Sequence, residues 1–370
     1  MRRSDEAFMR EALRLAKKGA GSVNPNPMVG AIIVRRGRIV ARGYHRGFGH
    51  PHAEIEALRA AKGNAKGATL YVNLEPCRHF GKTPPCTDAI IRAKIGRVVC
   101  GMRDPNTAAR GGIEILKRSG IKVSVGTLAS VARDLNEAFV TFYEKRRPFV
   151  ALKYAASLDG KLAARTGDSK WITSESARAY ARRLRGAHQA LVVGVETIIA
   201  DDPHLGARTK TLPDPLRVVL DSTLRIPLRA KVLRDSNAIV ATTNRASAKK
   251  KKALEKRGVR VLTFPDKQIA PARLLTALRA MNVISVLVEG GGAVLGSFID
   301  AGIVDKVYAF YAPILIGGEK AVTIGGHGAG RVANALRFKT SSIRRFNDTM
   351  LVVGSTRSST PRSKDMSAGD

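Results

Sequence analysis

The segment His52-Ala53-Glu54 stands ahead of two cysteine segments, Glu75-Pro76-Cys77 and Thr83-Pro84-Pro85-Cys86. One histidine and two cysteines form a ligand set that suits Zn²⁺, and a catalytic zinc site keeps its fourth position for water. The glutamate two residues after the histidine is not needed as a ligand, so it is free to move protons. Zn²⁺ brings the pKa of a bound water close to neutrality, and that water attacks an sp² carbon that bears an amino group. The pattern is typical of zinc-dependent hydrolytic deaminases, in which such a glutamate is the general acid and base.

The size and composition of the chain indicate a globular protein of two domains. At 370 residues it exceeds the size at which one hydrophobic core usually divides, and its 44% hydrophobic and 25% charged residues are ordinary for a folded chain. It has no apolar run of about 18 residues, and residues 1–11 lack the apolar core of a signal peptide. We therefore expect no membrane partner and a cytoplasmic location. Two of the three cysteines are assigned to the metal, and Cys100 is expected in a buried strand, so no disulfide framework is predicted.

The net charge of +34 is the unusual feature of the composition. Such an excess attracts nucleic acid, membranes or anionic substrates, whereas basic residues scattered over the surface would reflect solubility alone. The one dense run, Lys249 to Lys252, is expected at the start of an exposed helix. Aromatic residues make up only 5% of the chain and do not alternate with basic residues, which argues against a platform for stacking nucleic-acid bases.

Strands and helices alternate along the first part of the chain, which predicts an α/β layered sheet. Ser4 is a suitable N-cap for a helix that runs to about residue 18. Pro51 opens a helix over 52–61, so His52 and Glu54 are expected in its first turn. The other predicted elements are a hairpin of 29–34 and 39–43, strands over 69–74, 97–100 and 121–125, and helices over 87–94 and 112–119.

A polar stretch over 143–148 ends in a helix-breaking proline, and we place the domain boundary there, between domains of residues 1–146 and 149–354. The tail, 355–370, is rich in Ser, Thr, Arg and Gly, which predicts disorder. The second domain alternates again. Strands are predicted over 149–155, 190–194, 216–220, 237–242, 284–288 and 306–311, helices over 174–185, 272–281 and 293–301, and a closing hairpin over 341–346 and 350–353.

The first domain carries a specific combination of motifs. Eight residues, 78–85, separate the two cysteines, where the usual nucleoside deaminases have two, and the segment Asn24-Pro25-Asn26-Pro27-Met28-Val29-Gly30-Ala31 lies upstream. The combination resembles the deaminase domain of the bifunctional deaminase/reductase family of riboflavin biosynthesis, over residues 4–145. The resemblance implies a cytidine-deaminase-like, three-layer α/β/α domain. It also implies that His52, Cys77 and Cys86 hold zinc and that Glu54 shuttles protons; a purely structural zinc would leave Glu54 without a role.

Several polar residues around these motifs are candidates for substrate binding. Asn24 lies in a Pro-rich turn and is predicted to bond a pyrimidine edge, although an Asn before proline also forms an Asx turn. His45 and His79 flank the loops nearest the zinc and are predicted to contact substrate or phosphate, with a satisfied polar residue as the alternative. Lys82 is a phosphate candidate, or else a solvated lysine. The longer loop between the cysteines suits a substrate that carries a ribosyl phosphate.

The second domain lacks a standard dinucleotide fingerprint. The segment 290–296 follows a predicted strand and opens a helix, so its backbone N–H groups can meet a phosphate, although a tight turn also requires glycine. Further segments stand in order along the chain: Lys153-Tyr154-Ala155-Ala156-Ser157-Leu158-Asp159-Gly160-Lys161, Gly167-Asp168-Ser169-Lys170-Trp171-Ile172-Thr173, Val192-Val193-Gly194-Val195-Glu196-Thr197, Asp201-Asp202-Pro203-His204-Leu205-Gly206-Ala207-Arg208 and Val288-Glu289-Gly290-Gly291-Gly292. Together they resemble the reductase domain of the same family over residues 149–354, which implies a dihydrofolate-reductase-like α/β fold and NADPH as cofactor.

The resemblance also assigns roles in the second domain. Asp201 and Lys153 are the polar groups placed nearest the hydride transfer, with a helix or turn cap as the alternative for Asp201. Arg185 and Arg208 suit a phosphate through planar, charge-assisted hydrogen bonds, with surface ion pairing as the alternative. The implied NADPH contacts are Ala155, Trp171, Thr197, Asp201, Ser222, Gly291, Gly292, Ala293, Val294, Leu295, Gly296 and Ser297, and the implied substrate contacts are Ser169, Arg185, Leu205, Arg208 and Glu289.

These assignments predict a two-step enzyme that acts on a small phosphoribosylaminopyrimidine. Zinc-dependent deamination comes first, and NADPH-dependent reduction of the ribosyl group to ribityl follows. A homo-oligomer formed through the reductase domain is implied by the resemblance. A nucleic-acid deaminase would explain the charge but neither the second domain nor the cysteine spacing. A non-catalytic, zinc-stabilised nucleic-acid-binding protein would leave Glu54 unexplained.

Overall fold

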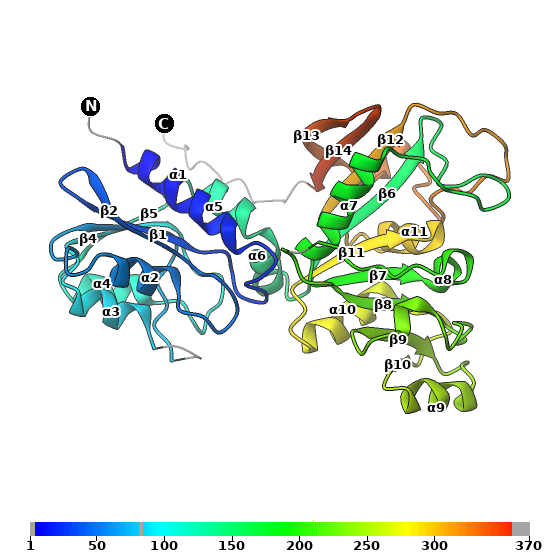
Figure 1. The fold of residues 1–370 in the computed structure, drawn as a ribbon, viewed down its shortest axis with the longest axis horizontal. Helices are drawn as coiled ribbons and strands as arrows, with labels where there is room; N and C mark the ends of the chain where they lie inside the picture. Colours follow the sequence, from blue (N-terminus) through cyan, green and yellow to red (C-terminus); the bar gives the residue numbers. More distant parts are fainter. Residues whose placement is uncertain (1–3, 81–83, 210, 357–370) are drawn as a thin grey trace, which may run out of the picture.

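The computed structural model describes residues 4–80, 84–209 and 211–356, and it shows two α/β domains side by side, each built on its own sheet (Figure 1). The sheet of the N-terminal domain has the strand order β2-β1-β3-β4-β5. β1 pairs antiparallel with both β2 and β3, and β3, β4 and β5 are parallel. The strands are β1 (Gly30–Arg35), β2 (Arg38–Tyr44), β3 (Thr69–Leu74), β4 (Arg97–Met102) and β5 (Lys122–Val125).

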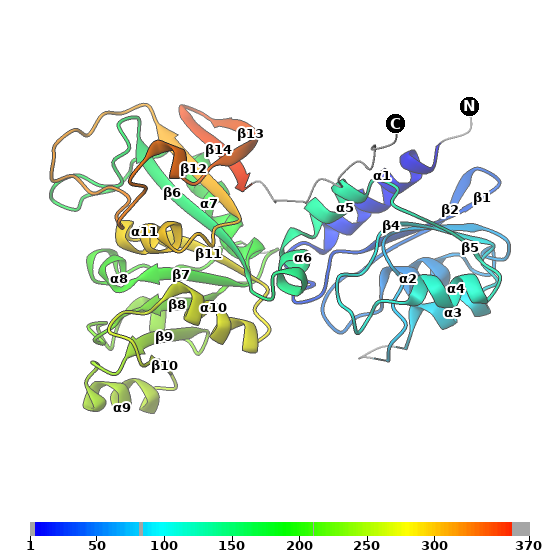
Figure 2. The ribbon, with the colours of Figure 1, turned by 180° about the vertical axis from the view of Figure 1, so that it is seen from behind.

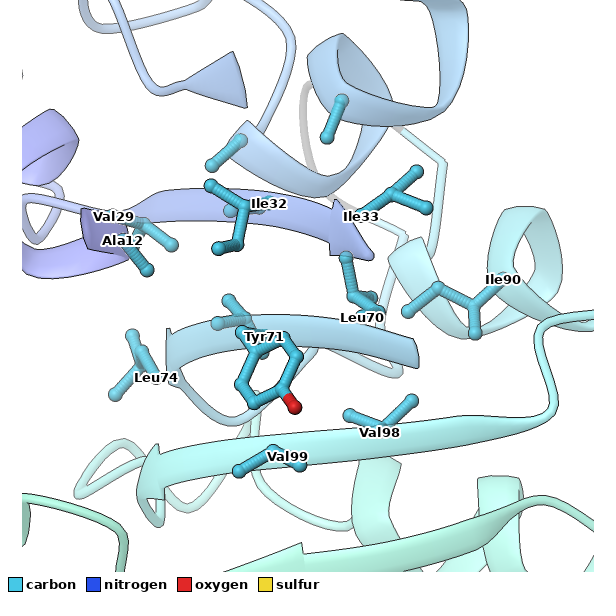
Figure 3. Close-up of a cluster of buried hydrophobic side chains, with 14 of the residues drawn as sticks. Ala12, Val29, Ile32, Ile33, Leu70, Tyr71, Leu74, Ile90, Val98 and Val99 are labelled. Atoms are coloured by element: carbon cyan, nitrogen blue, oxygen red, sulfur yellow. The ribbon is translucent and has the colours of Figure 1, made fainter. Parts of the chain in front are cut away.

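Helices cover both faces of this sheet, so the predicted three-layer arrangement is confirmed (Figure 1). Ser4 caps the first helix by accepting the Ala7 N–H, as predicted. Figure 3 shows the core between the layers, where side chains of β1, β3 and β4 meet Ala12 and Ile90 from helices on opposite faces. The helices are α1 (Asp5–Ala16), which a 3₁₀ turn (Lys17–Gly19) extends, α2 (Ala53–Ala60), α3 (Cys86–Arg92), α4 (Gly112–Arg118) and α5 (Ala129–Leu135), followed by α6 (Glu137–Glu144) at the junction of the domains.

The C-terminal domain is built on a nine-stranded sheet of order β10-β9-β8-β7-β11-β6-β12-β14-β13. The first seven strands in this order are parallel, and β14 and β13 continue the sheet antiparallel. The strands are β6 (Phe149–Ser157), β7 (Ala190–Gly194), β8 (Leu216–Leu220), β9 (Ala238–Thr243), β10 (Arg260–Phe264), β11 (Ser285–Gly290), β12 (Lys306–Ala312), β13 (Phe338–Phe346) and β14 (Thr349–Thr356).

Separate cores lie on the two faces of this sheet. The first core includes apolar residues of α7, α8 and α9, and the second those of α10 and α11. No helix in the described ranges is long and apolar enough to cross a membrane. The helices are α7 (Glu175–Ala187), α8 (Val195–Asp201), α9 (Ala248–Lys256), α10 (Pro271–Ala280) and α11 (Gly292–Asp300), with 3₁₀ turns at Lys231–Leu233 and Val332–Asn334.

Every helix and strand predicted from the sequence is present, with bounds that differ by a few residues at most. Cys100 is fully buried on β4, and the lysine run opens the exposed helix α9, both as expected. His52, however, is the N-cap of α2, and only Glu54 lies in its first turn. The predicted tail over 355–370 needs correction at its start, because Ser355 and Thr356 pair with β12 and β13 as the end of β14; the rest of it lies outside the described residues.

The two domains meet at α6 and the segment that follows it (Figures 1 and 2). Asp305, just before β12, is buried and accepts two hydrogen bonds from the Arg147 guanidinium, at 2.6 and 2.8 Å. Its carboxylate also accepts the Val150 N–H at 3.0 Å and the Lys145 ammonium at 2.9 Å. A buried carboxylate that accepts these four hydrogen bonds holds the connecting segment against the second domain.

His188, at the junction of α7 and β7, provides a test of the stability of the second domain. The ring is buried, and this burial lowers its pKa from 6.5 to about 4, although the Leu184 carbonyl accepts from Nδ1 at 2.8 Å. The unfolded chain binds this proton more readily, so stability falls as the pH drops below 6.5 and levels off below about 4. The loss in the free energy of unfolding amounts to about 3 kcal/mol.

The His188→Asn variant is expected to lose less stability than the parent between pH 7 and 4 in urea titrations. The exposed His327→Asn variant is the control, and equal pH dependence in all three proteins would contradict this role.

Candidate active sites

The three predicted zinc ligands converge at one end of the first sheet. His52 precedes α2, Cys77 follows β3, and Cys86 begins α3. The Nδ1 atom of His52 lies 3.3 Å from Cys86 Sγ and 3.5 Å from Cys77 Sγ, and the three ligand atoms all lie within 4.8 Å of one another. Tetrahedral Zn²⁺ with ordinary bond lengths places an N and an S ligand about 3.6 Å apart. The residues therefore fit a zinc ion bound by His52 Nδ1 and the two sulfurs.

Hydrogen bonding prepares one of the two cysteines as a thiolate. The Cys86 thiol and His52 lower the pKa of Cys77 below the ordinary value of a thiol, against the effect of burial. The same interaction with Cys77, together with burial, raises the pKa of the Cys86 thiol. The pair thus shares one proton, which must leave when both sulfurs bind a metal.

Glu54 lies beside this cluster and is only 3% exposed. Burial raises the pKa of its carboxyl group to about 7, the range in which one group can both accept and donate a proton. Glu54, His52 and Cys77 all line a cavity of about 220 Å³. The metal cluster is therefore open on one side, as a catalytic site requires and a closed structural site does not.

The upstream asparagines lie differently from the prediction. Asn24 does not line this cavity but lies on a groove between the two domains, whereas Asn26 lines the cavity. The Asn26 side chain bonds His45 Nε2 at 3.1 Å, and His45 Nδ1 bonds the Pro51 carbonyl at 3.1 Å. Since a carbonyl only accepts, the proton is on Nδ1 and Nε2 accepts from the amide. The structure thus favours Asn26 over Asn24 for contact with a pyrimidine edge.

The two predicted histidines both line the cavity, in different settings. His45 is 2% exposed, and its burial lowers the pKa of its ring, so it is neutral. His79 is exposed at the cavity mouth. Lys82, the phosphate candidate, lies outside the described residues.

A further polar wall of the cavity was not predicted from the sequence. Asp104, Asn106 and Glu75 all line it. The Glu75 carboxylate accepts the N–H groups of Asp104 at 3.1 Å and Gly111 at 2.8 Å, so it fixes the loop that follows β4. Burial raises the pKa of Asp104 to about 7. Because β3 and β4 are parallel neighbours, the polar residues after both strands meet at one edge of the sheet.

The predicted reductase residues gather at the carboxyl ends of β8, β7, β11 and β6, which are adjacent and parallel. Ligands of open parallel sheets bind at this edge. The register Val288↔Leu152 brings Lys153 beside Glu289 on the next strand, with Nζ to Oε1 at 3.0 Å. The Arg185 guanidinium from α7 meets the same carboxylate at 2.6 and 2.8 Å.

These three residues form a buried charge cluster. Glu289 has 7% of its side chain exposed, and although burial favours its neutral form, Arg185 and Lys153 hold the pKa of Glu289 at about 2. Two nitrogens of Arg185 are committed to Glu289 and the third lies 3.4 Å from the Gly206 carbonyl. The predicted contact of Arg185 with a substrate phosphate must therefore coexist with a buried ion pair.

The other predicted contacts lie in the same domain. Asp201 ends α8 and forms an ion pair with Lys170 at 2.8 Å, so its carboxylate is not a helix N-cap. Trp171 is 69% exposed, and the Arg178 guanidinium lies 4.3 Å from its ring centroid, so it is not a core residue. Each remaining residue lies on or beside the strands and loops of the same domain: Ala155 on β6, Thr197 in α8, Ser222 just after β8, and Ser169, the buried Leu205 and the exposed Arg208 in connecting segments.

Glycines allow the β11–α11 turn to pack closely against the neighbouring elements. Gly291 has φ +71°, a left-handed backbone that favours glycine, and it is the N-cap of α11. A Cβ at Gly290 would lie 3.3 Å from Thr197 Oγ1, and one at Gly194 would lie 2.9 Å from Val294. The predicted residues 292–297 form the first turns of α11. No described side chain caps the start of α11, so its first backbone N–H groups are oriented to meet a phosphate of the dinucleotide.

Gly296 in α11 lets a loop pack closely against the helix, and a substitution can test this role. A Cβ there would lie 2.0 Å from the Gly325 carbonyl oxygen, because the loop 321–326 crosses the helix at this point. The Gly296→Ala variant is expected to displace the loop, to lose roughly 1–3 kcal/mol of stability and to raise the KM for NADPH. Gly330→Ala is the control, since nothing lies within 4 Å of its Cβ position. Urea unfolding and initial rates measure both effects, and a G296A protein as stable as the control would contradict the packing argument.

Two family models match the two halves of the chain. Residues 2–102 match the cytidine and deoxycytidylate deaminase zinc-binding region, and residues 148–352 match the RibD C-terminal domain. The chain is thus a zinc-dependent deaminase joined to a reductase, as its two sites indicate. It belongs to the RibD family of riboflavin biosynthesis proteins.

Three similar proteins extend this match to the whole chain. The riboflavin biosynthesis protein RibD of Aquifex aeolicus is 43% identical over 354 residues, which cover 95% of this chain and 98% of that protein. The structure of Acinetobacter baumannii RibD superposes with a TM-score of 0.87 at 35% identity, and covers 95% of this chain and 98% of that one. A diaminohydroxyphosphoribosylaminopyrimidine deaminase/5-amino-6-(5-phosphoribosylamino)uracil reductase from Thermotoga maritima gives 0.83 at 38% identity, with the same coverage. The predicted family and two-domain fold are confirmed.

Proposed function

We propose that this chain catalyses two successive steps of riboflavin biosynthesis. The first is the zinc-dependent hydrolytic deamination of diaminohydroxyphosphoribosylaminopyrimidine. The second is the NADPH-dependent reduction of the ribosyl group to ribityl, which gives 5-amino-6-(5-phosphoribitylamino)uracil. The observation that carries the proposal is the His52, Cys77 and Cys86 cluster beside buried Glu54 in an open cavity. The name of the Thermotoga maritima relative supports both substrates.

Deamination replaces an exocyclic amino group by oxygen and releases ammonia. Bound Zn²⁺ supplies the electrostatic activation of a water molecule. Glu54 would take a proton from that water and give it to the ring nitrogen next to the reacting carbon. It would then take the remaining proton of the attached hydroxyl and pass it to the leaving amine, which departs as ammonia. The raised pKa of Glu54 suits both transfers. Asn26 and neutral His45, whose ring centroid lies 5.4 Å from that of His52, orient the pyrimidine beside the zinc ligands.

Reduction adds a hydride to the sugar carbon and a proton to the ring oxygen. NADPH supplies the hydride when it is bound at the carboxyl edge of the second sheet. Lys153 holds a proton on Nζ at that edge, and Glu289 keeps the ammonium in place. Asp201, paired with Lys170, is the second polar group near the transfer. Arg208, an exposed cation of the same region, is the proposed partner of the substrate phosphate.

The proposal extends to the organisation of the protein. We place the deaminase domain at residues 1–146 and the reductase domain at 149–354, with the protein in the cytoplasm. The covalent link raises the concentration of the intermediate at the second site. A homo-oligomer through the reductase domain is supported by β13, an edge strand on which Ile343 is 64% exposed. Light scattering of the purified protein tests the assembly.

Ammonia release without NADPH tests the substrate class. The purified protein is given the phosphoribosylaminopyrimidine, single-stranded DNA or tRNA. We expect ammonia from the small pyrimidine alone. Ammonia from either nucleic acid, with none from the pyrimidine, would support a nucleic-acid deaminase and would explain the net charge of +34 by nucleic-acid binding.

A further inference from the structure

Helix α6 belongs to the first domain by sequence but lies between the two domains (Figures 1 and 2). It packs against β6 and β11 of the second sheet. Glu137 in its first turn forms an ion pair with Lys306 on β12, and the Arg279 guanidinium from α10 lies 5.3 Å from the ring centroid of Phe142. The reductase domain thus holds this helix through a charge pair and a cation–π contact.

The other side of the same helix faces the deaminase cavity. Phe139 and Tyr143 both line that cavity, and their ring centroids lie 4.9 Å apart in an edge-on contact. Phe142, under Arg279, meets Tyr143 edge-on at 5.3 Å. One cavity wall therefore rests on a side chain that the reductase domain contacts.

A second connection begins at Asn136, directly before the helix. Its side-chain carbonyl accepts the Met28 N–H at 2.8 Å, and its amide donates to the Met28 carbonyl at 3.0 Å. Asn136 is 3% exposed, so these bonds are shielded from water. Met28 follows Asn26 and Pro27, both of which line the cavity. A shift at the start of α6 thus moves the loop that carries Asn26.

We propose that α6 and Asn136 position the residues of the deaminase site. The reductase domain fixes the position of this helix through the Glu137–Lys306 ion pair. This inference rests on the deaminase activity proposed above. None of Asn136, Glu137 and Lys306 lines the cavity or belongs to the zinc cluster. Their effect is therefore expected on substrate affinity and not on the chemical step.

The test measures ammonia release by the full-length protein with Lys306→Met, Glu137→Gln and both changes together. Each single change is expected to raise the deaminase KM about three- to tenfold, the range typical of residues that couple two sites, with kcat changed less than twofold. The double variant is expected to be no worse than the worse single variant, because both remove one interaction. Lys306→Arg, which keeps the charge, is expected to restore most of the affinity. Arg273→Met is the matched control, since Arg273 pairs with Asp266 within the reductase domain at 3.0 Å.

Zinc content and NADPH oxidation separate positioning from unfolding. All variants are expected to bind zinc like the parent and to reduce the deaminated substrate at the parental rate. An unchanged deaminase KM in active variants would overturn this inference but would leave the proposed deamination intact. A fall in kcat and zinc content without a rise in KM would also overturn it, because the site would then be unfolded and not displaced. If the parent protein releases no ammonia, both the proposed deamination and this inference are wrong.

Discussion

The Glu54→Gln variant is expected to release ammonia at least about a hundredfold more slowly than the parent, since general acid–base catalysis contributes 10²–10⁴. The amide keeps the size of the side chain but cannot take a proton from water or return it to the leaving amine. It lies outside the ligand cluster, so zinc content is expected to stay at the parental level. Ammonia release and zinc analysis of the same preparation check both statements.

Glu56→Gln is the matched control for this prediction. Glu56 lies in the same helix but pairs with Arg46 and Arg59, each at 3.5 Å. This variant is expected to deaminate at the parental rate. The thermal midpoint of the Glu54 variant is not expected to fall, because a buried ionisable group is replaced by a neutral one. Parental ammonia release from a zinc-loaded E54Q protein would show that Glu54 is not the proton shuttle.

The Lys153→Met variant is expected to oxidise NADPH at least about a hundredfold more slowly with the deaminated substrate, a loss within the range of general acid catalysis. The change removes the Nζ proton that Lys153, in the middle of β6, presents beside Glu289 of β11. Methionine fits the space of the lysine stem, and Glu289 keeps both hydrogen bonds to Arg185, so the domain is expected to fold. NADPH absorbance measures the loss, and ammonia release from the first substrate is expected to be unchanged.

Two further substitutions sharpen this result. Lys153→Arg keeps the charge but not the compact donor, so it is expected to recover only part of the rate. Lys251→Met, on α9 and bonded to Thr263 at 2.9 Å, is the control for the loss of a lysine. An active K153M protein would assign the proton transfer to another group, with Asp201 as the next candidate.

The metal site was predictable because its chemistry lies in short local motifs. His52, Cys77 and Cys86 each flank a predicted strand or helix, and few ions other than zinc suit that donor set. The alternation of strands and helices likewise predicted the layers of both domains. Short elements were missed: α5, α6 and α8 are each about two turns long, and β10 is a half-exposed edge strand.

The other residues of the cavity wall could not be predicted from local sequence. Asn24 and Asn26 lie in the same Pro-rich turn, and the contact that orients this turn is Asn136, 108 residues away from Met28. Asp104 and Glu75 become neighbours only through the parallel pairing of β3 and β4. A correct prediction of that pairing would have identified both carboxylates as residues of the site.

The reductase cluster shows the same limit. Arg185 and Glu289 were both predicted to contact substrate, but they are 104 residues apart and their ion pair depends on the packing of α7 against the strands. The strand register that brings Lys153 beside Glu289 is equally a long-range property. The resemblance to the family placed these residues at one site, and the structure shows which of their atoms form hydrogen bonds with one another.

The most direct test of the two-step activity follows ammonia and NADPH together. Zinc-loaded protein is mixed with the phosphoribosylaminopyrimidine and NADPH, and a parallel sample is treated with a zinc chelator. We expect ammonia to appear before NADPH is consumed, in equal final amounts. In the chelated sample we expect both signals to vanish, while NADPH is still oxidised when the deaminated pyrimidine is added. NADPH consumption that begins without ammonia release, or ammonia that is never followed by NADPH consumption, would contradict the order and coupling of the two sites.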